Sequence, residues 1–150
     1  MSIKETLQAD LNTAIKSRNS VVAETILMVL TAITNEEVAG KEKKELSDAE
    51  IITVLTREAK KRREAAEAFE AGGRADRAAT ERAEGEVIAG YLPEQLSEDD
   101  VKKLIAETIA AVGAAGPSDM GKVMGALKAK VAGKADGALV SSLVKEALNK

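Results

Sequence analysis

Hydrophobic residues recur every three or four positions along most of the chain, which is the spacing of one face of an α-helix. Serines followed three residues later by Glu or Asp form capping boxes, and these mark helix starts at Ser2, Ser47 and Ser97. The pattern predicts a helix after Ser2, one after Asn19 or Ser20 that fades in "EEVAGKEKKEL", one from Ser47 to Gly72-Gly73, and helices over about Arg74–Tyr91, Glu98–Val112, Asp119–Val131 and Gly137–Leu148.

The apolar positions of these helices predict two separate cores. The charged residues that follow the second helix, from Glu36 onward, are expected to form a solvated loop. In the N-terminal part the predicted apolar faces consist of Ile3, Leu7, Leu11, Ala14 and Ile15, then Val22, Ile26, Val29, Leu30 and Ile33, then Ile51, Ile52, Leu55, Ala59, Ala66 and Phe69. In the C-terminal part they consist of Val101, Leu104, Ile105, Ile109, Val123, Leu127, Leu139, Val140, Leu143 and Leu148.

The chain changes character at "YLPEQLSEDD". Pro93 disfavours helical geometry at Leu92, and a new helix starts shortly afterwards, so we place a domain boundary near Leu92–Leu96. The predicted fold class is all-α. An N-terminal helical domain of about four helices spans residues 1–92, and a small three-helix bundle spans residues 93–150.

Composition supports an all-helical fold and removes several kinds of chemistry. The chain has one Tyr, one Phe and no Trp, so its cores must be built from aliphatic side chains. It has no Cys, which excludes disulfides and thiolate metal sites. It also has no His, which removes the commonest general base and metal ligand. The N-terminus reads as an amphipathic helix rather than a signal peptide, so we expect a cytoplasmic protein without membrane contact.

The charge of −3 is unevenly distributed. Residues 1–92 carry a net charge of −3 and residues 93–116 another −3, whereas residues 117–150 carry +3. The basic part of this acidic protein coincides with "DMGKVMGALKAKVAGKADG". Two glycines, Gly121 and Gly125, stand inside a predicted helix there, where each costs about 1 kcal/mol relative to alanine.

On a helical wheel this stretch separates into two sides. Val123, Leu127 and Val131 share the core face, whereas Gly121 and Gly125 form a ridge without side chains, bordered by Lys122 and Lys128. Such a ridge permits close approach of another backbone. The pattern alone is equally compatible with a packed neighbouring helix and with an RNA backbone that is attracted by lysine.

Residues 130–137, at the end of this stretch, are likewise compatible with RNA contact and with a purely structural role. Lys130 and Lys134 add positive charge, although the helix dipole alone also favours lysines near a helix C-terminus. "GKADG" predicts a helix stop at Gly133 and a restart that Asp136 caps.

Two other groups of charges favour structural explanations. "REAKKRRE", residues 57–64, resembles a phosphate-binding strip, but its basic residues scatter around a helical wheel and Arg62 falls on the apolar stripe. We therefore expect a solvated face with Arg62 paired at a helix interface. Glu36-Glu37 and Asp99-Asp100 lie at predicted helix ends or in polar loops. Acids at a helix start favour the dipole, which explains Asp99-Asp100 without a function. We therefore expect no catalytic residues, no metal site and no cofactor.

"YLPEQLSEDDV", "DMGKVMGALKAKVAGKADGALVSSLVKEAL" and "REAKKRREAAEAFEAGGRADRAATERAE" closely resemble the GatB/YqeY family, and the N-terminal half is similar to its free-standing YqeY branch. The resemblance implies an elongated N-terminal helical domain. It also implies a C-terminal domain similar to the tail of the B subunit of the tRNA-dependent aspartyl/glutamyl-tRNA amidotransferase, which grips tRNA away from the chemistry.

The resemblance implies that a set of motif residues faces RNA or shapes the RNA-facing turn. With the bordering Lys128, the predicted RNA-binding residues are Gly121, Lys122, Gly125, Lys128, Lys130, Gly133, Lys134 and Asp136, with Ala135 inside the same turn. Lys134 stands where the family more often has arginine, which weakens a planar, bidentate phosphate contact.

The leading hypothesis is a non-catalytic tRNA-binding accessory protein of modest, salt-dependent affinity that reads shape and charge. DNA is not an expected partner. A second hypothesis is a module that docks a helix of a partner such as an aminoacyl-tRNA synthetase or an amidotransferase subunit. A third is a component of a glutamine-dependent carbon–nitrogen ligase that acts only in a complex, because the chain lacks a phosphate-binding loop of its own: "EAGGRAD" follows a predicted helix rather than a strand.

Overall fold

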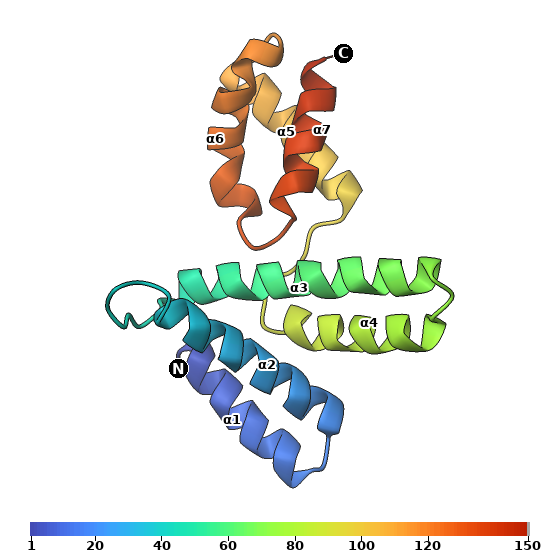
Figure 1. Ribbon diagram of the computed structural model, residues 1–150. Coiled ribbons are helices and arrows are strands. Elements are labelled where there is room, and N and C mark those ends of the chain that lie inside the picture. Colours follow the sequence, from blue (N-terminus) through green and yellow to red (C-terminus); the bar gives the residue numbers. More distant parts are fainter. Residues whose placement is uncertain (150) are drawn as a thin grey trace. The chain divides into compact units, whose positions relative to one another are not determined.

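The computed structural model describes residues 1–149, and this part of the chain is helical without any strand (Figure 1). The predicted all-α class is confirmed. None of the helices in the described range is long and apolar enough to cross a membrane. The elements are α1 (Ile3–Lys16), α2 (Ser20–Glu37), α3 (Asp48–Ala71), α4 (Ala75–Ala89), α5 (Glu98–Val112), the 3-10 helix η1 (Pro117–Asp119), α6 (Met120–Val131) and α7 (Gly137–Leu148).

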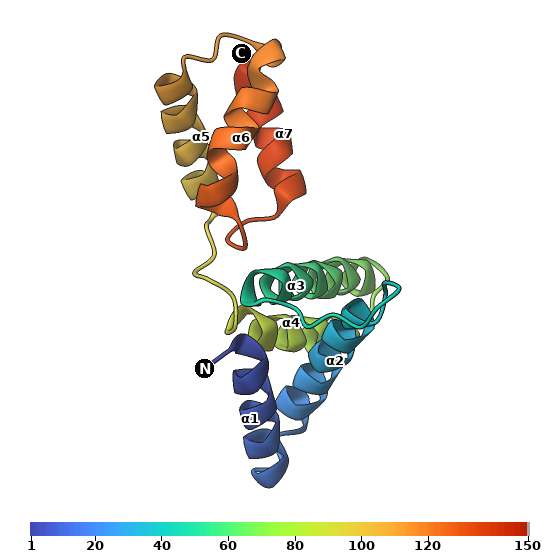
Figure 2. The ribbon, with the colours of Figure 1, turned by 90° about the vertical axis from the view of Figure 1, so that its left-hand side faces the viewer.

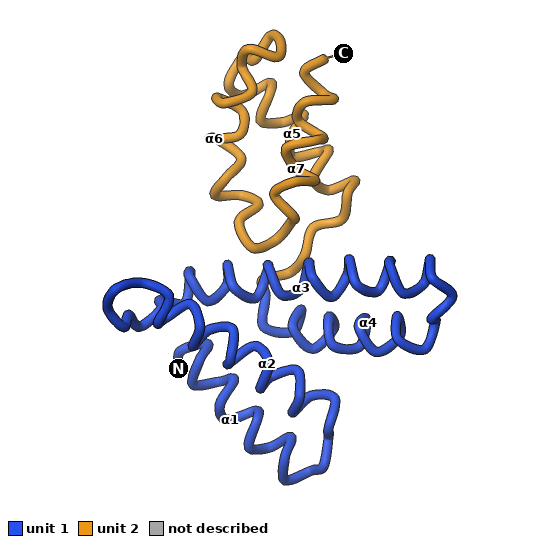
Figure 3. The backbone as a smooth tube through the Cα atoms, in the orientation of Figure 1, with its two compact units in different colours: residues 1–92 blue, residues 93–150 orange. Residues whose placement is uncertain are grey.

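The chain divides into two compact units (Figure 3). The first unit comprises residues 1–92 and contains α1 to α4. The second unit begins at Pro93 and contains α5, η1, α6 and α7. Each unit has its own aliphatic core.

Side-chain caps fix most of the helix starts that the sequence predicts. The side chain of Ser2 accepts a hydrogen bond from the α1 backbone, and Asn19 does the same for α2. Complete capping boxes stand at Ser47 and Ser97, before α3 and α5. Asp136 caps α7. Each such cap satisfies an amide at the helix start that would otherwise lack a partner.

The first unit consists of two helix hairpins, α1 with α2 and α3 with α4 (Figures 1 and 2). Their apolar faces meet in one core, which α4 joins only through its last turn. The fully covered members of this core are Leu7, Ile26, Val29, Ile33, Ile51, Val54, Leu55 and Ile88.

Several predicted core positions are wrong in detail. Ile15 is 59% exposed, because it lies at the very end of α1 beside the turn into α2. Leu139 is 36% exposed, because it precedes the buried Val140 by one residue, and a rotation of 100° carries it off the packed face of α7. On α3 the buried face is wider than the predicted stripe and includes Val54 and Glu58, since α1, α2 and α4 all contact this helix.

Glu37 corrects the prediction of a fully solvated loop after α2. Its side chain is only 3% exposed and lies 3.0 Å from Lys4 Nζ. The same carboxylate accepts a hydrogen bond from the Leu46 amide at 3.4 Å, while its carbonyl accepts from the Lys44 amide at 2.9 Å. Glu37 therefore holds the loop of residues 38–47 back against α1. The hydrogen bond from Lys4 is the main reason that the pKa of Glu37 lies below its ordinary value.

We predict that Lys4→Met destabilises the first unit at pH 7, because it leaves the buried Glu37 carboxylate without its counter-ion. The lowered pKa means that the ionised pair stabilises the fold above the ordinary carboxyl pKa, and that this contribution is lost as pH falls through the lowered value. The difference in stability between the wild type and the variant should therefore shrink below about pH 4. Urea denaturation at pH 7 and at pH 3.5 measures it.

Lys16→Met is the matched control, because Lys16 is an exposed lysine on the same helix and enters none of the ion pairs seen in residues 1–149. It should change stability little at either pH. A loss for Lys4→Met that is the same at both pH values would contradict the role given to the ion pair.

Candidate nucleic-acid interface

One side of α6 builds the core of the second unit. Val123, Leu127 and Val131 are buried against α5 and α7, and Met120 and Met124 pack at the edges of the same cluster. This is the core face that the helical wheel predicts. Since α6 makes these contacts with one side only, its opposite side faces solvent.

The solvent-facing side of α6 carries only small residues and lysines. We call it the basic face of α6. It contains no acidic residue and no side chain longer than a methyl group apart from the lysines. Its exposed members are Gly121, Lys122, Gly125, Ala126, Lys128, Ala129, Lys130 and Ala132.

The two glycines of the basic face touch no other helix of the second unit. A Cβ atom added to Gly121 or Gly125 would find no heavy atom of this unit within 4 Å beyond the local helix backbone. No neighbouring helix of residues 93–149 therefore uses the ridge for close packing. Of the two explanations that the sequence leaves open, packing inside this unit is removed.

The lysines of the basic face are available for an external partner. Lys122, Lys128 and Lys130 are exposed, and the ion pairs formed within residues 1–149 do not involve them. From Lys122 to Lys130 the helix rises about 12 Å. The positive charge is thus spread along the helix rather than gathered at one end, with Lys122 and Lys128 on either side of the ridge and Lys130 farther round the helix.

The turn between α6 and α7 has structural reasons for its sequence. Gly133 has a φ of 71°, a left-handed conformation that glycine adopts without strain. Its carbonyl accepts a hydrogen bond from Gln95 Nε2 at 2.8 Å, and the carbonyl of Lys134 accepts from the Leu96 amide at 2.9 Å. The side chain of Asp136 accepts from the Ala138 amide at 3.3 Å, as predicted for a cap.

These turn residues are only half-exposed, unlike the basic face of α6. The structure thus separates the predicted site residues into an open set on α6 and a set at the turn, whose contact with RNA stays a prediction. The sequence analysis missed Gln95 and Leu96, which hold the turn from the start of the unit. The only signal was the position of "EQL" directly after Pro93.

The basic run of α3 serves pairing within the protein, as expected. Arg62 lies at the interface with α4, where its guanidinium is 3.4 Å from both Glu81 and Glu84. Arg57 pairs with Glu36 of α2 at 3.3 Å. These two arginines are paired with carboxylates inside the first unit.

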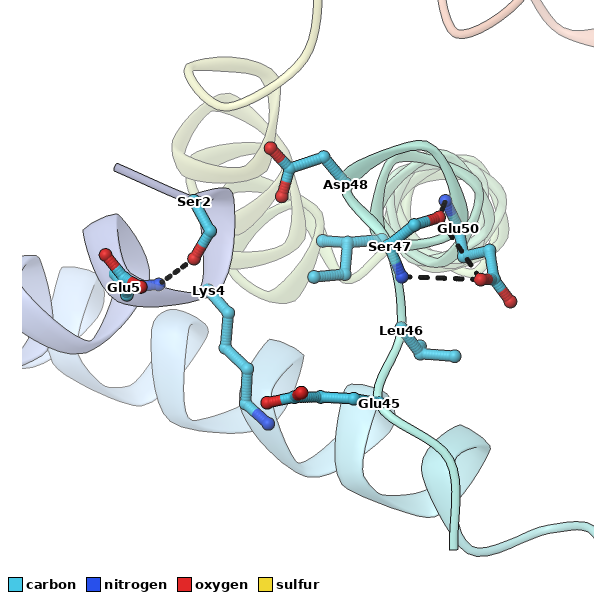
Figure 4. Close-up of a pocket in the computed structure, with 9 residues that line it drawn as sticks. Ser2, Lys4, Glu5, Glu45, Leu46, Ser47, Asp48 and Glu50 are labelled. Atoms are coloured by element: carbon cyan, nitrogen blue, oxygen red, sulfur yellow. Dashed lines mark hydrogen bonds between the residues drawn. The ribbon is translucent and has the colours of Figure 1, made fainter.

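The acidic residues likewise serve helix ends. Asp100 completes the capping box of α5, and Asp99 lies in the same first turn, as predicted. A pocket of about 430 Å³ lies where α1 and α3 begin (Figure 4). Its polar groups bond to one another: the Glu5 amide donates to Ser2, and Glu50 bonds to Ser47. Residues 1–149 contain no group of three acidic side chains arranged to hold a metal ion.

The chain is thus an all-α protein of two compact units, the second of which exposes a basic helix face. A family model described as Yqey-like protein matches residues 4–148, and the chain therefore belongs to the YqeY-like family. A search of curated proteins finds no match to the chain.

Because the ridge is open, we predict that Gly121→Ala and Gly125→Ala each stabilise the second unit by about 0.5–1 kcal/mol. The added methyl group meets no atom of the chain, and alanine loses less conformational entropy than glycine when the helix forms. Slower hydrogen exchange of the buried amides of α6 would report the gain.

Gly133→Ala is a control that should lower stability rather than raise it. Position 133 has a left-handed conformation, which costs alanine about 1–2 kcal/mol, so hydrogen exchange of the buried amides of α6 should become faster. Destabilisation by Gly121→Ala or Gly125→Ala would mean that the ridge is packed rather than open.

Proposed function

We propose that the protein is a non-catalytic tRNA-binding accessory protein that holds the RNA backbone on the basic face of α6. The observation that carries the proposal is the pair of exposed glycines, Gly121 and Gly125, which have no packing partner among residues 93–149. They weaken the helix by about 1 kcal/mol each, and no packing contact inside the second unit offsets this cost. Contact with an RNA backbone would account for them.

The chemistry of the basic face suits a sugar-phosphate backbone. The bare ridge lets a partner approach the helix backbone, and Lys122, Lys128 and Lys130 can reach phosphates along about 12 Å of helix. Only a few phosphates can be neutralised in this way, so binding should be of modest affinity and should weaken steeply as salt is added.

The second unit offers no means of reading bases by stacking. Residues 93–150 contain neither an aromatic residue nor an arginine. Recognition would therefore depend on the shape and charge of a folded RNA rather than on unpaired bases. The resemblance of this unit to the tail domain of the amidotransferase B subunit supports tRNA as the RNA in question.

The test is binding of total tRNA to the full chain between about 50 and 200 mM salt. The triple variant Lys122→Ala, Lys128→Ala and Lys130→Ala should bind at least tenfold more weakly at the lowest salt concentration. The slope of log K against log salt concentration should become less negative by about 2 to 3, because three phosphate contacts are removed.

The matched control removes the same charge from other faces of the unit, by Lys102→Ala, Lys103→Ala and Lys145→Ala. All three lysines are exposed on α5 or α7. If both triple variants lose affinity equally, net charge rather than the basic face of α6 governs binding. Absence of tRNA binding by the wild type at low salt would overturn the proposed function.

Docking of a partner helix is the alternative that the open ridge also permits. Gly125→Leu separates the two, because it fills the ridge at a position where an added Cβ meets no atom of the second unit, and it removes no charge. Association with a partner protein that depends weakly on salt, survives the lysine substitutions and is lost in Gly125→Leu would favour this alternative.

A further inference from the structure

Helix α4 is anchored unequally along its length. At its C-terminal end Ile88 is 1% exposed in the core of the first unit, and Val87 packs beside it. Directly after the helix, the Tyr91 hydroxyl donates to Asp10 of α1 at 2.5 Å. In contrast, Ala78 is the only buried residue of α4 before Ile88. Residues 75–85 therefore gain little from the hydrophobic core.

What holds residues 75–85 against α3 is a charge network centred on Arg62. The guanidinium lies 3.4 Å from Glu81, 3.4 Å from Glu84 and 3.8 Å from Glu58 of its own helix. Its Nη1 also lies 3.0 Å from the sulfur of Met28 on α2. The side chain is only 20% exposed, so these interactions are less screened than those of a surface pair.

The helix backbones come close at this point. A Cβ added to Gly85 of α4 would lie 3.7 Å from the Cβ of Arg62. Gly85 therefore places α4 directly over the base of the Arg62 side chain. The partly buried Arg62 side chain thus connects α3 and α4 in the region where apolar contacts between them are sparse.

The network is held by charge more than by well-formed hydrogen bonds. Arg62 Nε and Glu81 Oε2 are buried and have no hydrogen-bond partner within residues 1–149, although they lie 3.4 Å apart. Three carboxylates share the one guanidinium, and Glu58 has a further basic neighbour in Lys61, at 3.3 Å. Such an arrangement depends on attraction at a distance and therefore on ionic strength.

The tip of the hairpin adds only surface contacts. Arg82 pairs with Glu70, and Arg77 stacks over Phe69 at 5.8 Å. Arg74, before the first turn of α4, offers no side-chain cap. Exposed pairs of this kind contribute little to stability.

We propose that residues 75–85 form a segment that opens from α3 as a unit, with Arg62 as an electrostatic latch, while the end of α4 stays in the core. The inference concerns the first unit alone and does not rest on RNA binding. Opening exposes the inner faces of α3 and α4 without unfolding the α1–α2 hairpin. High salt favours opening, although it weakens the latch only in part, because partly buried charges are screened less than exposed ones.

Hydrogen exchange of the full chain, followed by mass spectrometry at 50 mM and 1 M NaCl, tests the latch. In the wild type, amides of residues 77–85 should exchange at least threefold faster at high salt, while those of α1 and α2 change less than twofold. Arg62→Met should produce the fast exchange already at low salt. Equal acceleration throughout the first unit, or no acceleration in residues 77–85, would overturn the proposal.

Two further variants separate the latch from a general loss of charge. Arg57→Met removes an exposed arginine of the same helix, paired with Glu36 of α2, and should leave residues 77–85 unchanged. Arg62→Lys keeps the charge without the planar fork. On a logarithmic scale it should reverse at least half of the increase in exchange rate that Arg62→Met causes in residues 77–85. Exchange in Arg62→Lys as fast as in Arg62→Met would show that packing, rather than charge, closes the segment.

Discussion

Both units depend on cores made of aliphatic side chains alone. The single Phe and the single Tyr, Phe69 and Tyr91, are each only half-buried, so no large ring fills the space between helices. Leu, Ile and Val must then be covered by close contact between helix faces, and each helix needs a clean apolar face. Where such a face is missing, as in the first three turns of α4, other forces must hold the helix.

This constraint explains which features the sequence predicts well. Apolar periodicity and caps are local properties. They identify α5 and α7 with their bounds, Ser2, Ser47, Ser97 and Asp136 as caps, and Asn19 as one of two candidate caps for α2. The prediction for Ile15 fails because coverage at a helix end depends on what neighbouring elements supply, and the prediction for Leu139 fails because it lies at the edge of the packed face of α7. The prediction that Glu37 is solvated is also wrong, because this charged residue next to a polar loop becomes buried once Lys4 and the Leu46 amide approach it.

The candidate interface shows the same division. A helical wheel is enough to place Gly121, Gly125 and the lysines on one side of α6. It cannot tell whether a ridge of glycines is filled by another helix of the same chain, because that depends on the packing of α5 and α7. The structure answers this question for residues 93–149, since no atom of this unit lies within 4 Å of a Cβ added to either glycine.

The hydrogen bonds that join the α6–α7 turn to the start of the second unit have a consequence for its evolution as a portable module. Gln95 and Leu96 precede the first helix of the unit, yet they hold the carbonyls of Gly133 and Lys134. The natural unit of inheritance is therefore longer than its three helices. A gene fusion that joined a foreign sequence at Ser97 would transfer every helix and lose the contacts that shape the turn, whereas a junction before Pro93 would carry the turn with the bundle.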